Sequence, residues 1–151
     1  MNSTKFSLKI GILSLVIISF FVGFVFKDIV PGGAAGDFEA ITWPLLQSFK
    51  KDFYFSITNY GRFGEGSYPL FYIINAYLNP FSSNKLYFVL SVTFFSFLTF
   101  ILLAILLKKS FQQINYIDSL FASSVILLLP FFRSSAYGGT TENFGWFFLI
   151  L

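Results

Sequence analysis

Long apolar runs separated by short charged segments dominate this sequence. Lys9 and Lys27 enclose the first run, IGILSLVIISFFVGFVF, and Lys85 and Lys108 enclose the second, LYFVLSVTFFSFLTFILLAILL. At about 1.5 Å per residue the second run is long enough to cross a bilayer with some tilt, and the first lies near the lower limit. The first run also exceeds the usual signal-peptide core of about 7–15 residues, which favours an uncleaved helix. The pattern predicts membrane-spanning helices over about 8–27 and 86–107.

Two further apolar segments follow. The run SLFASSVILLLPFF lies between Asp118 and Arg133, and with its uncharged flanks it predicts a third span over about 117–133. The final residues, FGWFFLIL, are too few to span a bilayer and predict the incomplete start of a fourth helix over 144–151. The expected fold is therefore all-α, a single polytopic membrane domain over 1–151. We expect it to be the N-terminal piece of a longer protein or a truncated gene product.

Lysine placement predicts the orientation. Short cytoplasmic segments are enriched in Lys and Arg, and the segments that a cytoplasmic N-terminus would leave inside carry Lys5, Lys9, Lys108 and Lys109. Residues 28–85 then form one long outer loop, and six of the seven acids lie outside. We expect a multi-pass protein of the cell inner (plasma) membrane whose active face is external or periplasmic.

The outer loop carries two predicted interfacial helices. Thr42 is a typical N-cap and Pro44 suits a first helical turn. From Trp43 to about Phe53 one stripe is apolar, as in an amphipathic helix; its members are Trp43, Leu46, Phe49 and Phe53. Residues 66–84 lack charge and are rich in Tyr and Phe, which predicts a segment at headgroup level that stops at Asn79-Pro80.

Composition narrows the chemistry. The chain has 151 residues, of which 56% are hydrophobic and 11% charged, and it contains no cysteine and no histidine. Disulfides and thiolate or imidazole sites are therefore absent, and acid–base chemistry falls to Asp, Glu, Lys or Tyr. The net charge of +3 is scattered, which argues against nucleic-acid binding. No cofactor motif or carboxylate metal cluster is present, and assistance by a divalent metal is left open.

The order of these features resembles the N-terminal part of a GT-C-type glycosyltransferase. The matching residues are GDFEA (36–40) in the first outer loop, SYPLFY (67–72) before the second span, and Arg133 with TTENF (140–144) in the second outer loop. The likeness to dolichyl-phosphate-mannose and aminoarabinose transferases implies that a sugar passes from a polyprenyl-phosphate donor to a lipid-linked or cell-surface glycan acceptor. The acid pair departs from the family's adjacent acids, and most of the family's spans are missing.

Asp37 is the predicted catalytic residue. Sugar transfer needs a base near the acceptor hydroxyl, and without histidine a carboxylate is the natural choice. Asp37 follows a glycine-rich bend at the membrane surface, where lipid donor and polar acceptor both arrive; the alternative is a solvated loop acid. Glu39 shares a face with Asp37 in a strand and points away from it in a helix. We expect it to bind or orient the acceptor.

Arginines are candidates for the donor phosphate, because guanidinium pairs bidentately with phosphate oxygens. Arg133 is the favoured one, since an Arg at a span end is costly unless paired. Glu142 is its expected partner or a second active-site acid. Arg62 is a candidate whose alternative is a solvated charge, and Tyr68 is a candidate sugar platform whose alternative is an aromatic belt.

Two readings from other classes remain. A transporter or flippase would show charges within its spans and internal repeats; the first two predicted spans contain no charge. A non-catalytic membrane subunit is the other alternative. The isolated 151-residue chain is expected to lack transferase activity.

Overall fold

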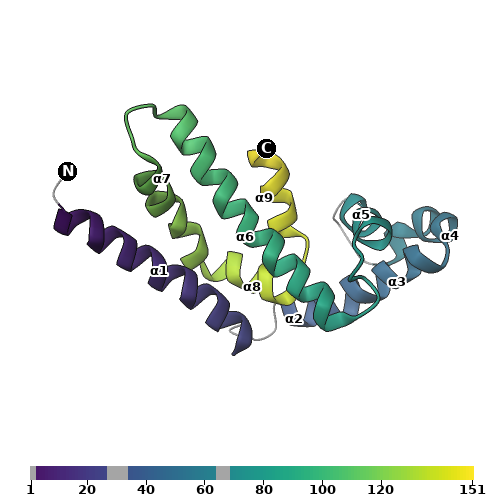
Figure 1. The fold of residues 1–151 in the computed structure, drawn as a ribbon. Helices are drawn as coiled ribbons and strands as arrows, with labels where there is room; N and C mark the ends of the chain where they lie inside the picture. The colour runs from purple at the N-terminus through teal and green to yellow at the C-terminus, as the bar shows by residue number, and fades with distance from the viewer. Residues whose placement is uncertain (1–2, 27–33, 64–68) are drawn as a thin grey trace.

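The computed structural model describes residues 3–26, 34–63 and 69–151, which form helices and turns without a strand (Figure 1). The chain begins with α1 (Ser3–Val25). The segment between the two long helices then contains α2 (Ala34–Asp37), the π-helix η1 (Phe38–Thr42), α3 (Trp43–Lys51), α4 (Phe53–Thr58), the 3₁₀ helix η2 (Tyr60–Phe63) and α5 (Leu70–Leu78). The remaining elements are α6 (Lys85–Ser110), α7 (Tyr116–Ser123), the 3₁₀ helix η3 (Ser124–Leu128), α8 (Pro130–Gly138) and α9 (Glu142–Ile150). The predicted all-α class is confirmed for the described residues.

Two helices in the described part are long and apolar enough to cross a membrane. They are Phe6–Val25 within α1 and the whole of α6. Large apolar side chains point outward from both helices; Leu15 is 67% exposed and Phe94 57% exposed. Such faces suit contact with lipid rather than water. A third candidate span results if the bent segment from Tyr116 to Gly138 is counted as one, so the described residues contain two or three helices of this kind.

The third apolar run differs from the single helix expected over 117–133. It consists of Tyr116–Leu128 and Pro130–Gly138, bent by 72° at Leu129. Pro130 explains the break, because proline lacks an N–H group and disfavours helical backbone at the preceding residue. Leu129 accordingly has φ −69° and ψ 122°. Pro130 then occupies the first turn of α8, where its missing N–H costs nothing.

Arg133 sits at this break and holds it together. Its Nε donates to the Leu127 carbonyl at 2.6 Å, and its Nη2 donates to Ser19 Oγ on α1 at 2.8 Å. The guanidinium thus satisfies a carbonyl at the end of the first half-helix and links the break to α1. Arg133 lies in the first turn of α8, just after the break, and its position relative to the end of a span stays a prediction.

One apolar core joins the long helices. α6 packs against α7, α8 and α9, while α1 packs against α7, η3 and α8. The buried residues are Val16, Phe20, Phe100, Leu127, Phe132, Ala136 and Tyr137. The Tyr137 hydroxyl donates to the Phe20 carbonyl at 2.5 Å. Gly23 leaves room for this ring, because a Cβ there would lie 2.8 Å from the Tyr137 hydroxyl oxygen.

A second, aromatic-rich core lies at the end of the molecule where α6 begins. There α3 packs against α5, and Figure 1 shows α2–α5 gathered beyond the long helices. Its buried members are Phe38, Leu45, Leu46, Phe49, Phe71, Tyr72, Ala76, Phe88 and Val92. Helices α2–α5 therefore share a core with the start of α6, and their place at a membrane surface stays a prediction.

The predicted helix boundaries in this unit are partly wrong. Thr42 does not start α3: its backbone is helical, its side chain caps nothing, and the chain arrives through η1. α3 ends at Lys51, and Asp52 then caps α4 by accepting from the Phe55 N–H at 2.9 Å. Phe53 therefore belongs to the next helix, and Leu45 is buried instead. The predicted stop at Asn79-Pro80 is confirmed, because α5 ends at Leu78.

The structure groups the helix ends in two sets. Lys9 forms a 2.6 Å ion pair with Asp118, so the start of α1 lies beside the start of α7. The end of α6 with Lys108 and Lys109 is at this same end, and α2–α5 lie at the other (Figure 1). Which end faces the cytoplasm stays a prediction.

Cysteine labelling tests the orientation. We expect a cysteine at Thr58, exposed at the end of α4, to react with an impermeant thiol reagent applied outside intact cells, and one at Ser110 to react only after permeabilisation. The native chain has no cysteine that would give background. Labelling of the Ser110 site without the Thr58 site would reverse the orientation.

Candidate functional site

The acidic segment identified in the sequence is helical. Asp37 ends α2 and Phe38 begins the π-helix η1, which contains Glu39. Both carboxylates are exposed, and Phe38 between them is buried. π-Turns are rare and occur frequently at functional sites. Because the backbone is helical rather than extended, the two acids do not share one face.

Phe38 anchors this segment to the α8–α9 turn. α2 packs against α8, and the Phe38 ring stacks on Phe88 with centroids 6.0 Å apart. Gly139 in the turn has φ +68°, and a Cβ there would lie 3.2 Å from the Phe38 ring and 3.1 Å from Val89. Glycine therefore provides both the left-handed backbone and the space for the ring. The anchor fixes the backbone of Asp37 against α8.

Glu39 is engaged in an ion pair. Its Oε2 lies 2.5 Å from Lys85 Nζ at the start of α6, and this ammonium also lies 5.9 Å from the centroid of the Trp43 ring. The side chains of Glu39 and Lys85 are 60% and 48% exposed, so the pair contributes at most about 1 kcal/mol to stability. It does restrict where Glu39 points.

Asp37 differs from the other described acids because its carboxylate makes no hydrogen bond or ion pair within the described part of the chain. Asp52 caps α4, Asp118 pairs with Lys9, and Glu39 pairs with Lys85. Glu142 accepts two hydroxyl hydrogen bonds. The oxygens of Asp37 are therefore available to an external group.

Glu142 begins α9 beside the same turn. Its Oε2 accepts from Ser135 Oγ at 2.9 Å and from the Thr140 hydroxyl. A carboxylate in a first helical turn is also favoured by the helix dipole. Ser135 and Thr140 therefore bind the Glu142 carboxylate, and its pairing with Arg133 stays a prediction.

A buried amide fixes α9 in place. Asn143 is 1% exposed; its Nδ2 donates to Ser96 Oγ on α6 at 2.9 Å and to the Phe132 carbonyl at 2.8 Å. Its backbone N–H points to Ser135 Oγ at 3.3 Å. These bonds hold the Glu142 end of α9 against α6 and α8.

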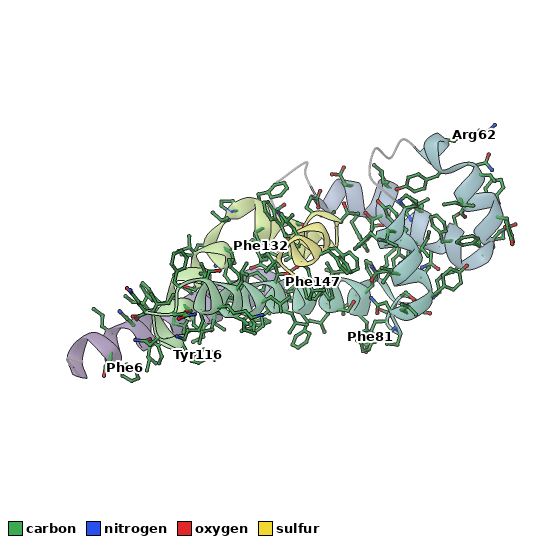
Figure 2. The ribbon with its side chains drawn as sticks, turned by 90° about the horizontal axis from the view of Figure 1, so that it is seen from above. Phe6, Arg62, Phe81, Tyr116, Phe132 and Phe147 are labelled. Carbon is green, nitrogen blue, oxygen red and sulfur yellow. The ribbon has the colours of Figure 1, made fainter. Side chains whose placement is uncertain are left out.

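The other predicted site residues do not lie at the junction between the Asp37 segment and the α8–α9 turn. Figure 2 shows Arg62 at the far tip of the α2–α5 unit, well away from Phe132 and α9, and its side chain is exposed. Arg133 is directed at the break and α1. Tyr68 lies outside the described residues. Within the described ranges, no group of three His, Cys, Asp or Glu side chains is placed to hold a metal ion.

Sequence reasoning missed Lys85 as the partner of Glu39 and Ser135 as a partner of Glu142. Lys85 is 46 positions from Glu39, and no local pattern links them. A signal for Ser135 was present in the polar run SSAYGGTTEN between two apolar segments, which indicates a clustered turn.

Comparisons with known proteins give no relative. No protein-family model matches the chain, and no curated protein or solved structure matches it.

Substituting Gly139 tests the anchor. We expect Gly139→Ala to lower the free energy of unfolding by about 1–3 kcal/mol, because alanine is strained at positive φ and its Cβ crowds Phe38. The control is Gly11→Ala in α1, where a Cβ meets nothing within 4 Å; it should leave stability unchanged or raise it by up to about 1 kcal/mol. Denaturant unfolding in detergent, followed by circular dichroism, measures both. Equal stabilities for the two variants would contradict the anchor.

Proposed function

We propose that this chain belongs to a membrane glycosyltransferase that moves a sugar from a polyprenyl-phosphate donor to a lipid-linked or cell-surface glycan acceptor. Asp37 is the proposed general base. The observation that carries the proposal is that Asp37, alone among the acids in the described ranges, has a carboxylate without an internal partner. Its backbone is nevertheless held by the buried Phe38.

The chemistry requires that combination. The acceptor hydroxyl oxygen attacks the anomeric carbon, its proton passes to the base, and the bond from sugar to phosphate breaks with its electron pair leaving on the phosphate. A base must reach the hydroxyl at about 2.6–3.2 Å. A carboxylate already bonded within the protein would first have to give up a partner. Asp37 also lies at the end of the apolar helices, where a lipid donor and a polar acceptor meet.

The leaving phosphate needs a cation to stabilise its charge. Arg133 was the first candidate, but its guanidinium bonds to Leu127 and Ser19 favour a structural role. We assign the phosphate to Lys85, which Glu39 brings to the acidic segment; its side chain is half exposed, and an ammonium bonded to one carboxylate oxygen has further N–H groups to donate. Glu39 then orients this lysine, and Glu142 is the second acid at the junction.

A transporter is the second candidate function, and the break at Leu129 favours it. Discontinuous helices form the substrate and ion sites of many transporters, with unwound carbonyls as ligands. Here the Leu127 carbonyl accepts from Arg133, which supports a structural break over an ion site. Ion flux that disappears in Arg133→Gln and persists in Asp37→Asn would favour the transporter.

Asp37→Asn tests the transferase proposal in the complete protein. We expect turnover of a polyprenyl-phosphate sugar to fall about 10²–10⁴-fold, because asparagine keeps the shape but accepts no proton. Membrane insertion and yield should be unchanged, since the side chain is exposed and makes no internal bond.

Glu39→Gln and Glu142→Gln are the matched comparisons. Glu39→Gln should have the smaller effect, as it loosens Lys85 without removing the base. Near-normal turnover in Asp37→Asn with loss in Glu142→Gln would move the base to Glu142. Full activity in all three variants would remove the main residue of the proposal.

A further inference from the structure

One cation at the α3–α6 boundary is surrounded by hydroxyls instead of acids. Lys50 Nζ lies 2.9 Å from Ser83 Oγ and 3.1 Å from Ser82 Oγ, in the turn before α6. Neither of the two ion pairs among the described residues includes Lys50. An ammonium without a counter-charge, held beside hydroxyl groups, is suited to an external anion.

The hydrogen bonds leave donors available at this point. Ser82 is buried and gives its own proton to the Asn79 carbonyl at 2.7 Å, and Gln47 Nε2 holds the Ser82 carbonyl at 3.0 Å. The ammonium has three N–H groups, of which two are used by the serines. Its third N–H and the exposed Ser83 hydroxyl proton meet no acceptor among the described residues. Both are suited to bind one phosphate group.

Two apolar grooves meet beside this cluster. One has a volume of about 270 Å³ and lies between α5, α6 and α9, where Leu78, Phe81 and Phe144 contribute to its lining. The other, of about 340 Å³, runs along α6 past Leu90 towards Phe21 of α1. Phe81 and Ser91 line both grooves, and Phe81 directly precedes Ser82. Figure 2 shows Phe81 at the outer surface of the molecule.

The position of the cluster along α6 matches a headgroup level. α6 has 26 residues, about 39 Å at 1.5 Å per residue, whereas the hydrocarbon core is about 30 Å thick. The residues just before Lys85 therefore fall at the membrane surface, while Leu90 and Phe94 fall within the acyl region. The positive end of the α6 dipole adds to the attraction for an anion.

We propose that Lys50, Ser82 and Ser83 bind the phosphate of a two-chain anionic phospholipid, with one acyl chain in each groove beside Phe81. Two grooves that share Phe81, the residue before Ser82, match two chains on one headgroup. An anionic headgroup is favoured because it brings no second positive charge next to Lys50. The site uses elements other than the Asp37 segment, so it is tested independently of sugar transfer.

Lipid retention measures the site. The purified chain in detergent is titrated with phosphatidylglycerol, and native mass spectrometry counts bound lipid. We expect one tightly held phosphatidylglycerol, with diacylglycerol and single-chain lysophosphatidylglycerol binding at least about tenfold more weakly. Lys50→Gln should weaken phosphatidylglycerol binding about 10- to 100-fold, as expected for losing a charge-assisted contact. Lys50→Arg should retain most of the binding and show that the fold tolerates substitution.

Matched variants separate the site from general attraction. Lys51→Gln removes the neighbouring charge, which has no bonded partner among the described residues, and should leave binding unchanged. Leu90→Trp should weaken binding by filling one groove, whereas Leu98→Trp, exposed on α6 outside both grooves, should not. Equal loss in Lys50→Gln and Lys51→Gln, or in both tryptophan variants, would overturn the proposal. Displacement by millimolar inorganic phosphate, or retention of polyprenyl phosphate in place of phosphatidylglycerol, would overturn it as well.

Discussion

The arrangement of the candidate site depends on how the chain satisfies its backbone at the Leu129–Pro130 break. In an apolar environment an unbonded carbonyl costs several kcal/mol, so a broken helix needs internal partners. Arg133 supplies one by donating to Leu127, and it is itself held by Ser19 of α1. The 72° bend then sends α8 towards α2, which places the Gly139 turn under Phe38. The position of the Asp37 segment thus follows from a bend far later in the chain, between η3 and α8.

Hydrogen bonds from small polar residues also join the long helices. Buried hydroxyls on α6 bond to carbonyls of their own helix, as Thr93 does with Val89 and Ser96 does with Val92. This lets polar side chains exist inside apolar helices at little cost. Some also reach neighbours: Thr93 Oγ1 lies 2.9 Å from the Ala136 carbonyl, and Ser96 accepts from Asn143. Where lipid is as apolar as the side chains, such bonds and close packing hold helices together.

The sequence predicted those elements that one local pattern determines. The charge-free runs gave α1 and α6, and Asn79-Pro80 gave the end of α5, because length and helix-stopping residues act locally. The N-cap at Thr42 failed for a tertiary reason. Burial of Phe38 and Thr42 extends helical backbone upstream through the π-turn, so Thr42 has no helix start to cap.

The apolar length of the third run predicts one span, although Pro130 marks the break in it. Apolar length alone cannot distinguish a straight helix from two halves, and the proline was the deciding local signal. Contacts between distant residues were beyond prediction altogether. Glu39 meets Lys85 and Lys9 meets Asp118 only because helices pack side by side. The sequence therefore identifies the acids but does not show which of them form ion pairs.

Asp37 differs from the other described acids in having no bonding partner within the described part of the chain, and this has a simple energetic basis. An exposed carboxylate keeps its hydration and needs no partner to be tolerated, so nothing in folding selects for a bond to Asp37. Lys50 shows the same feature with opposite charge, as its ammonium meets hydroxyls and no acid. Glu39 and Lys85 differ from both, because their side chains are also largely exposed but form an ion pair with each other. Both charges, Asp37 and Lys50, lack an opposite charge among the described residues and stand on backbone fixed by buried neighbours, Phe38 and Phe49, which leaves them accessible to the external groups proposed above. The proposed base and the proposed lipid site lie at the same end of the long helices and use separate charges.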